Sequence, residues 1–348
     1  MPSKSPGSAR SAPPILHPAR REELLSAFPD VRVLVIGDVM LDQFIWGRVT
    51  RISPEAPVPV VEFERESSMP GGAANVARNL TALGAHAGIF GAVGRDAAAP
   101  QLAALLRQDG VTCTGLLPIA NRLTSTKTRI VAGHQQVTRL DRETRGGLRP
   151  SDVQRLLQKI DRHLPTADAV IVGDYGKGVV TQDLLDGLRE RCHAQGKWIS
   201  LDPKPVHNID IHGLSLITPN RKEAFELADL SDTTRNPDPL SDPQLLGVAE
   251  KLLAELKPAL LLITLGELGM LLCRRGQPPF HIPTVAQEVF DVSGAGDTVI
   301  ATFTLAIAAG ASPVEAAILS NHAAGVVVGK FGTATVTPAE LASSFPRA

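Results

Sequence analysis

The feature that most constrains the fold is a regular alternation of short apolar strands with helices along most of the chain. The first strand, Val31 to Ile36, is rich in β-branched residues and ends in Gly37 and Asp38, which is typical of a strand buried on both faces of a parallel sheet. Further strands are predicted at residues 87–93, 169–172, 198–201, 214–218 and 259–264, with helices between them. The alternation predicts an α/β fold in which helices cover both faces of a mostly parallel sheet, giving three layers.

Two segments do not follow this alternation. Residues 43–70 contain four prolines and alternate apolar with polar positions, and residues 122–142 alternate charged with β-branched positions. We therefore predict a small β lid built from these two segments, outside the main sheet. Residues 1–25 carry Pro, Ser and Arg with little apolar content near their start, so they are predicted to form a flexible tail before one domain over residues 26–348.

Composition excludes several classes of partner. The 35 basic and 36 acidic residues give a net charge of −1 without a long block of like charge, which indicates neither nucleic acid nor a membrane as the main partner. The three cysteines, Cys113, Cys192 and Cys273, are far apart and lack metal-ligand spacing, so neither a disulfide framework nor a zinc site is predicted. A reducing, cytoplasmic location fits this pattern, and no apolar run is long enough to span a bilayer.

The stretch Asp291-Val292-Ser293-Gly294-Ala295-Gly296-Asp297 combines an anion hole with a carboxylate. Gly294, Ala295 and Gly296 stand at the mouth of a predicted helix, where backbone N–H groups and the helix dipole favour negative charge. Asp297 ends the turn within reach of a bound group and is a candidate base for a hydroxyl proton. These are the two parts that phosphoryl transfer needs, although an ordinary glycine-rich turn capped by aspartate has the same pattern.

Polar residues also follow the first predicted strand and the first lid segment. Asp38 and Asp42 lie beyond the carboxyl end of that strand, where open α/β sheets bind ligands, and a carboxylate there can accept hydrogen bonds from a polyol. Gly71, Gly72 and Asn75 open the next helix, where the glycines allow close approach and the amide can bind hydroxyls. No Gly-x-Gly-x-x-Gly follows the strand, which argues against a dinucleotide-binding enzyme.

A third polar turn, Asn220 to Glu223, follows the predicted strand at residues 214–218. The two side chains are three residues apart on the first turn of a helix, so both can face one site. One carboxylate and one amide oxygen suit a hydrated Mg²⁺ that bridges ATP phosphates, whereas a helix-capping arrangement is the more common reason for Asn-x-x-Glu.

In this order the motifs resemble those of the ribokinase-like (PfkB) carbohydrate kinases, over about residues 31–345. The stretch ending in Asp297 is similar to the family signature Asp-Thr-x-Gly-Ala-Gly-Asp, although Val292 replaces the threonine. The resemblance implies that Asp297 is the catalytic base, that the backbone at residues 294–296 stabilises the transferring phosphoryl group, and that Gly71, Gly72 and Asn75 bind the sugar. No Walker A motif and no protein-kinase signature is present.

The resemblance also predicts the nucleotide and cation sites. The turn containing Thr264, Gly266 and Gly269 is similar to the segment that flanks the ATP phosphates, and Asn321 lies in a helix with small residues that leave space for a base. Asp291 stands where relatives bind a monovalent cation, which predicts a K⁺ site beside the Mg²⁺ carried with ATP.

Residues 47–60 and 126–129 look like those of the D-glycero-D-manno-heptose-7-phosphate kinases of lipopolysaccharide core synthesis. That resemblance implies phosphorylation of the C1 hydroxyl to give the 1,7-bisphosphate, in a form without the second, nucleotidyltransferase activity because the chain stops at Ala348. A phosphorylated sugar needs cations, and the candidates near the ligand edge are Arg129, Arg139, Lys177 and Lys204.

The sequence leaves three points open. A kinase of another sugar or sugar phosphate, such as fructose, ribose or fructose 6-phosphate, keeps the same motifs, and a non-catalytic sugar-phosphate sensor is a further alternative. Arg129 and Arg139 fit solvated strand faces as well as a phosphate site. If one edge or face of the lid sheet is exposed, we expect the protein to form a homodimer through that sheet.

Overall fold

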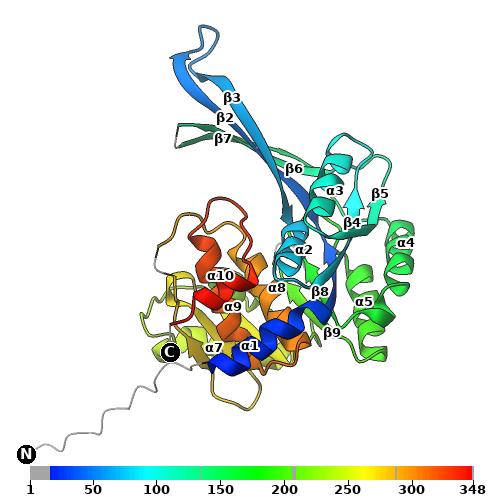
Figure 1. Cartoon of the computed structure of the whole chain (residues 1–348), viewed down its shortest axis with the longest axis vertical. Coiled ribbons are helices and arrows are strands. Elements are labelled where there is room, and N and C mark those ends of the chain that lie inside the picture. Colours follow the sequence, from blue (N-terminus) through cyan, green and yellow to red (C-terminus); the bar gives the residue numbers. More distant parts are fainter. Residues whose placement is uncertain (1–15, 134, 206–208, 287, 347–348) are drawn as a thin grey trace, which may run out of the picture.

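The computed structural model describes residues 16–133, 135–205, 209–286 and 288–346 (Figure 1). Its centre is a nine-stranded sheet with the order β13-β12-β11-β10-β9-β8-β1-β4-β5. The strands of this sheet are β1 (Arg32–Gly37), β4 (His86–Val93), β5 (Thr112–Pro118), β8 (Ala169–Gly173), β9 (Trp198–Asp202), β10 (Leu216–Ile217), β11 (Leu260–Thr264), β12 (Met270–Cys273) and β13 (Phe280–Ile282). Neighbouring strands from β5 to β11 are parallel, and only the pairs that involve β12 and β13 are antiparallel.

Helices cover both faces of this sheet. They are α1 (Pro18–Ala27), α2 (Ala73–Ala82), α3 (Ala98–Gln108), α4 (Pro150–Asp161), α5 (Gln182–Ala194), α6 (Arg221–Leu227), α7 (Pro243–Glu255), α8 (Ala295–Ala308), α9 (Pro313–Val328) and α10 (Pro338–Ser343). Alternate residues of β1 point to opposite faces, so Val33 and Val35 belong to one apolar core with α2, α8 and α9, while Leu34 and Ile36 belong to another with α4, α5 and α7. The predicted three-layer α/β fold is confirmed.

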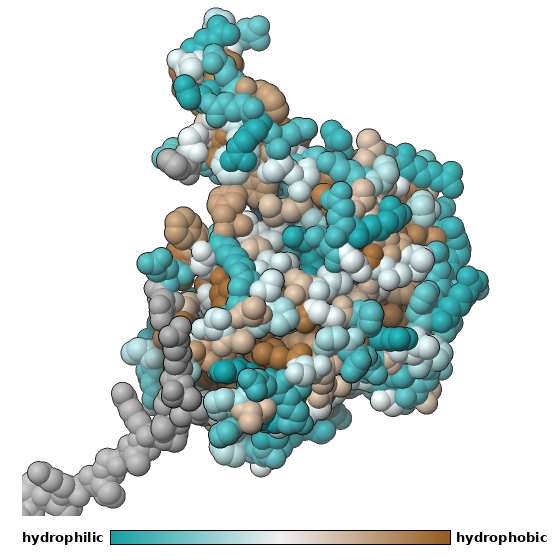
Figure 2. Space-filling model, in the orientation of Figure 1, coloured by the Kyte–Doolittle hydropathy of each residue, from teal (hydrophilic) through white to brown (hydrophobic). Residues whose placement is uncertain are grey.

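A second sheet of four strands stands off the main body (Figures 1 and 2). It consists of β2 (Val39–Ile52), β3 (Pro59–Gly72), β6 (Ser125–Ala132) and β7 (Gln135–Arg142), in the order β3-β2-β6-β7. The strands come from the two segments predicted to form the lid, and β2 and β3 are each 14 residues long. Figure 2 shows a notch between this sheet and the main body.

The prediction of a flexible tail over residues 1–25 is wrong for its described part, and residues 1–15 lie outside the described residues. Pro18 opens helix α1, in which Leu24 is buried, and Phe28 just after the helix is also buried. The guanidinium of Arg21 lies 4.7 Å above the ring of Phe345, so the helix packs on the C-terminal end of the fold. The sequence did not predict this helix because its apolar content is low. The buried side chains of Leu16, Leu24 and Phe28 are nevertheless enough to pack the segment against the fold.

Among the residues that the structure describes, no helix combines the length and the apolar character needed to cross a bilayer.

Candidate active site

Helix α8 presents its first turn to the carboxyl-end edge of the main sheet. The N-cap Gly294 has φ 81°, a left-handed conformation that favours glycine, and a Cβ atom there would lie 2.7 Å from Asn75 Nδ2. The Ala295 N–H donates to the carbonyl of Val292, so it is not free to bind an anion as predicted. Within the described part of the chain, the N–H groups of Gly296 and Asp297 have no hydrogen-bond acceptor, and these two remain as donors for an anion.

The carboxylate of Asp297 is buried and held on both oxygens. Asn75 Nδ2 donates to Oδ2 at 2.7 Å, and the hydroxyl of Tyr175 donates to Oδ1 at 2.5 Å. Burial raises the pKa of Asp297 to about 6, against the lowering effect of the hydrogen bonds from Tyr175 and Asn75. A carboxyl group with this pKa is ionised at neutral pH and is still basic enough to accept a hydroxyl proton as the bond to phosphorus forms.

Helices α2 and α8 are fixed to each other by a second buried contact one turn away. The hydroxyl of Thr298 donates to Asn79 Oδ1 at 2.9 Å, and Asn79 lies four residues after Asn75 on α2. The Asn75 side chain therefore reaches Asp297, and its own Oδ1 is a buried oxygen without a hydrogen-bond partner among the described residues. An unpartnered acceptor beside a buried base suits a substrate hydroxyl, and sugar binding by Asn75 stays a prediction.

Tyr175 was not predicted as a site residue. It lies in the loop after β8, and no local sequence pattern indicates that its side chain meets Asp297, which is 122 positions later in the chain. The loop is held by Asp38, whose fully buried carboxylate accepts three backbone N–H groups, from Tyr175, Lys177 and Val179, each at 2.9 Å. The prediction that Asp38 binds substrate is therefore corrected, because its oxygens hold the loop that carries Tyr175.

Gly71 and Gly72 lie at the end of β3, against the carboxyl end of β1. A Cβ atom on Gly71 would lie 2.0 Å from Asp42 Oδ2, and Gly72 has φ 58°, so both positions require glycine. Asp42 is buried and pairs with Arg129, whose Nη1 lies 2.6 Å from Asp42 Oδ1. The structure thus brings Asp42, Gly71 and Gly72 together at the base of the lid, and their binding of a sugar stays a prediction.

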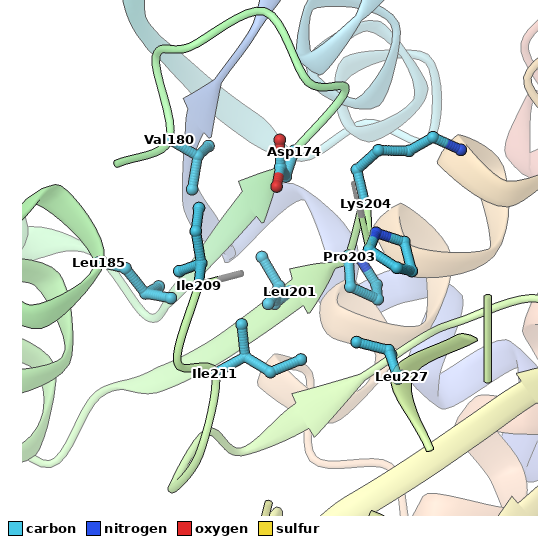
Figure 3. A pocket seen from close by; sticks show the side chains of 10 residues that line it. Asp174, Val180, Leu185, Leu201, Pro203, Lys204, Ile209, Ile211 and Leu227 are labelled. Atoms are coloured by element: carbon cyan, nitrogen blue, oxygen red, sulfur yellow. The ribbon is translucent and has the colours of Figure 1, made fainter. Parts of the chain in front are cut away.

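Each of the four cations predicted for the substrate phosphate has an acidic partner. Besides the Arg129 pair, Arg139 bonds to Asp141 at 2.8 Å on exposed strand β7, and Lys177 pairs with Glu143. Lys204 pairs with Glu223 at 2.9 Å, a residue predicted for the nucleotide side. Figure 3 shows Lys204 at the rim of a small apolar cavity of about 10 Å³, which has room for about one water and no ligand.

A large cleft of about 680 Å³ lies beside the start of α8. Its lining includes four of the six residues predicted for the nucleotide side and the tip of α8: Thr264, Gly266, Gly269, Asn321, Ala295 and Gly296. The other two predicted residues, Asn220 and Glu223, are not part of this lining. Small residues of α9, Ala324 and Gly325, form part of its wall, as a flat base requires. Asn321 donates to the carbonyl of Pro283 at 2.7 Å, so its amide nitrogen is already used by the protein.

The Asn220–Glu223 turn is a capping box. Asn220 Oδ1 accepts from the Glu223 N–H at 3.0 Å, Glu223 Oε2 accepts from the Asn220 N–H at 3.1 Å, and Glu223 Oε1 accepts from Lys204 Nζ at 2.9 Å. The side-chain oxygens that were predicted to bind Mg²⁺ thus already accept hydrogen bonds from the protein. They suit contact with water molecules bound to the ion, and not direct coordination of it. Among the described residues, no group of three or more His, Cys, Asp or Glu side chains is arranged to hold a metal directly.

Asp291, the predicted K⁺ ligand, bridges two segments. Its Oδ1 accepts from the Ser293 N–H at 2.9 Å and its Oδ2 from the Gly332 N–H at 3.1 Å. Burial tends to raise its pKa, but these backbone hydrogen bonds lower it overall, so the carboxylate is charged. The negative charge of Asp291 suits a bound cation. In the structure, the two hydrogen bonds of Asp291 join the turn before α8 to the segment after α9.

Comparisons with known proteins identify the family of the chain. Residues 31–340 match the family described as pfkB family carbohydrate kinase. The bifunctional protein HldE of Caulobacter vibrioides is 47% identical over 90% of this chain and 63% of the relative, and that of Desulfatibacillum aliphaticivorans is 44% identical over 91% and 63%. This chain therefore spans less than two thirds of the length of these relatives.

Solved structures agree on the fold. A ribokinase of Arabidopsis thaliana complexed with ribose and ATP has a TM-score of 0.72 at 18% identity, covering 90% of this chain and 98% of that one. Phosphofructokinase-2 from Escherichia coli in complex with potassium has a TM-score of 0.70 at 20% identity, covering 90% and 97%. The ribokinase-like architecture predicted from the motifs is thus confirmed, while identities this low show the fold alone.

Proposed function

The chain belongs to the pfkB family of carbohydrate kinases, and from that premise we propose that it phosphorylates the C1 hydroxyl of D-glycero-D-manno-heptose 7-phosphate with ATP. The product would be the 1,7-bisphosphate, a precursor in ADP-heptose and lipopolysaccharide core synthesis. The observation that carries the catalytic part is Asp297, a buried carboxylate with a pKa of about 6 that stands where α8 meets the 680 Å³ cleft. The heptose part is supported by the similarity to HldE proteins along 90% of the chain.

The reaction uses the residues of this site in a simple order. Asp42, Gly72 and Asn75 hold the sugar at the base of the lid, with its C1 hydroxyl toward Asp297. Asp297 takes the hydroxyl proton while the C1 oxygen bonds to the γ-phosphorus, and the bond from that phosphorus to the β–γ bridging oxygen breaks to release ADP. Because Tyr175 and Asn75 hold the carboxylate on both sides, its orientation is set before the sugar binds.

Negative charge on the transferring group needs donors and cations. The free N–H groups of Gly296 and Asp297 lie at the positive end of the α8 dipole, and Gly296 lines the nucleotide cleft. Mg²⁺ bound to ATP would neutralise phosphate oxygens, and Asn220 and Glu223 are the residues that would hold its water shell. Each oxygen of Asp291 accepts one backbone N–H and keeps a second lone-pair site, which could serve a K⁺ ion. We propose a cytoplasmic location, where ATP is available.

The experiment is a coupled assay of ADP release with a panel of sugars. The panel contains D-glycero-D-manno-heptose 7-phosphate, sedoheptulose 7-phosphate, fructose 6-phosphate, ribose and fructose, and ³¹P NMR identifies the product. We expect turnover of the heptose phosphate and a new anomeric phosphate signal. Preference for another sugar would refute the heptose proposal but leave the proposed role of Asp297 as the base unchanged. Absence of turnover with every sugar of the panel would favour a sugar-phosphate sensor.

The role of Asp297 has its own test. Asp297→Asn should lower kcat by about 10²- to 10⁴-fold because the base is lost, with ATP affinity within about twofold of the wild type. Titration calorimetry with a non-hydrolysable ATP analogue measures that affinity. If nucleotide binding fell together with turnover, Asp297 would have to be assigned to the nucleotide site.

We also propose that the four-stranded sheet mediates a homodimer. Every residue of β7 is exposed, apart from any contact in an assembly, and β7 is an edge strand of that sheet. Large apolar side chains on the same sheet are exposed as well, with Ile52 at 60%, Phe63 at 64% and Leu140 at 57%. Sedimentation velocity at micromolar concentration checks this proposal, which a monomer would refute.

A further inference from the structure

The face of the lid that looks toward the main domain can be defined from strand register. Side chains alternate along β2, so Asp42, Phe44 and Trp46 share one face, and residues directly opposite on neighbouring strands share it too. The rings of Phe44 and Trp46 lie 5.9 and 5.4 Å from that of Phe331, which follows α9 in the main domain. We call this face the inner lid face; its members include Asp42, Phe44, Trp46, Arg65, Lys127, Arg129, Val131, Arg139 and Asp141.

The inner lid face and the loop beside it carry five cations. Arg65 lies with its guanidinium 4.3 Å from the centre of the Trp46 ring, and the other four act on one another. The electrostatic surroundings of Lys127 include the charges of Lys177, Arg129 and Arg139, and of the carboxylate of Asp42. Three of these four cations have an acidic partner, as described above. Among the residues that the structure describes, Lys127 has no ion pair and no hydrogen bond from its ammonium group.

The environment of Lys127 disfavours its charge in the absence of an anion. The side chain is half-buried on β6, and burial lowers the pKa of its ammonium group, with the three neighbouring cations adding to the effect and Asp42 opposing it. A half-buried charge without a partner costs stability, and a doubly charged anion at this place would remove that cost.

Strand register places Lys127 on the side of the sugar site. It lies directly opposite Asp42, which contacts Gly71 just before α2, and Asn75 on the first turn of α2 bonds to Asp297. The charge of Lys127 lowers the pKa of Asp297, while that of Asp42 raises it. A single ligand can therefore place a hydroxyl at Asp297 and an anionic group at the inner lid face. Arg129 and Arg139 are held by Asp42 and Asp141, so they add positive potential without being free to move onto the anion.

We infer that Lys127 is the residue that binds the phosphate group of the sugar-phosphate substrate and selects it over the unphosphorylated sugar. This rests on the proposed function, because it assigns the phosphate of the substrate proposed there. The ammonium group is a compact point charge with three donors on a long stem, which suits a terminal phosphate whose position varies with the conformation of the sugar chain.

The test compares Lys127→Met with the wild type on two substrates, D-glycero-D-manno-heptose 7-phosphate and unphosphorylated D-glycero-D-manno-heptose. Methionine keeps the length and apolar stem of the side chain and removes the charge. We expect kcat/KM for the sugar phosphate to fall by about 10- to 100-fold, mainly through KM, because a charge-assisted hydrogen bond is lost. The value for the unphosphorylated sugar and the KM for ATP should stay within about twofold of the wild type.

Three further measurements separate binding from a structural effect. Lys127→Arg should recover part of the preference for the phosphate, because it keeps the charge. Lys257→Met is the matched control, since Lys257 is exposed after α7, outside the proposed site, and its replacement should show no change with either sugar. Thermal unfolding without substrate should show Lys127→Met to be at least as stable as the wild type.

The outcomes are distinguishable. Turnover of the sugar phosphate by the wild type tests the proposed function, and its absence would overturn that function and this inference together. If the wild type uses the sugar phosphate and Lys127→Met uses it equally well, the inference alone is wrong. Equal losses on the phosphorylated and the unphosphorylated sugar would likewise refute it, because the lysine would then act on the fold or on catalysis.

Discussion

Replacing Tyr175 with phenylalanine should change the pH at which the enzyme becomes active. The substitution keeps the ring and removes the hydroxyl that donates to Asp297 Oδ1 at 2.5 Å. That hydrogen bond favours the ionised form of the carboxylate and opposes the effect of burial on its pKa. Without it, Asp297 should hold its proton to a higher pH, so that a smaller share of the enzyme has a free base at neutral pH.

The size of the effect follows from the strength of such bonds. A hydrogen bond to a charged group contributes about 1.5–3 kcal/mol, and one pKa unit corresponds to about 1.4 kcal/mol. The pKa of Asp297, about 6 in the wild type, should therefore rise by about one to two units in Tyr175→Phe. At pH 7 the ionised share would fall from about nine tenths to between about a half and a tenth, so kcat/KM should drop by about 2- to 10-fold.

The assay is a pH profile of kcat/KM for the sugar between pH 5 and 9 at constant ionic strength. We expect the acid limb of Tyr175→Phe to lie about one to two pH units above that of the wild type, with activity recovering toward pH 9. Thr128→Val is the control, because it removes a hydroxyl that bonds to Gln43 at 3.0 Å on the lid, away from the base. Its acid limb should coincide with that of the wild type.

Tyr175 is the only tyrosine in the chain, so an NMR signal from ¹³Cζ-labelled tyrosine belongs to it alone. The signal should shift as Asp297 titrates near pH 6, which gives the pKa of the base without an activity measurement. An acid limb of Tyr175→Phe that coincides with the wild type would refute the reasoning. So would a uniform loss of activity at every pH, since the hydroxyl would then act through the fold.

Three further changes have definite outcomes. Because the pKa of Asp297 rises from 3.8 to about 6 in the folded protein, its carboxyl group favours the fold at low pH, and that contribution disappears as the pH rises through 6. Asp297→Asn should therefore raise the free energy of unfolding in urea at pH 8 by up to about 3 kcal/mol and leave it unchanged below about pH 4, and equal gains at both pH values would contradict this. Gly294→Ala should lower kcat, because the added methyl group would lie 2.7 Å from Asn75 Nδ2 and the backbone at this residue has φ 81°. Steady-state kinetics at saturating ATP measure this effect, and a kcat equal to that of the wild type would contradict the prediction. Leu24→Ala should cost about 2–4 kcal/mol in chemical unfolding because Leu24 is 1% exposed, whereas exposed Glu22→Ala should cost almost nothing, and equal stabilities would mean that α1 is not docked.

The sequence allowed the architecture to be predicted because its signals are local. Runs such as residues 31–36 specify a buried strand by themselves, and the order of such runs leaves few topologies. The glycines at 71, 72 and 294 were also predictable as site residues, since close approach and left-handed backbone require them.

Other parts of the site depend on contacts between residues far apart in the chain. Asp38 and Asp297 are both aspartates near glycine, yet one accepts three backbone N–H groups and the other meets Tyr175 and Asn75. Nothing local distinguishes them. Lys127 was not predicted as a site residue for a similar reason. Its role depends on the ion pairs that the neighbouring cations make with other residues, and the sequence does not show these pairs.

The contacts of Asp38 have a mechanical consequence. Asp38 joins the last residue of β1 to the first residue of the lid strand β2, and its backbone donates to the carbonyl of Gly173 and accepts from the N–H of Ala73 at the start of α2. Its side chain holds the Tyr175 loop, so one buried residue ties together the start of the lid, the start of α2 and the loop whose tyrosine orients the base. A change at Asp38 would therefore disturb Asn75 and Tyr175, the two residues that hold Asp297, at the same time.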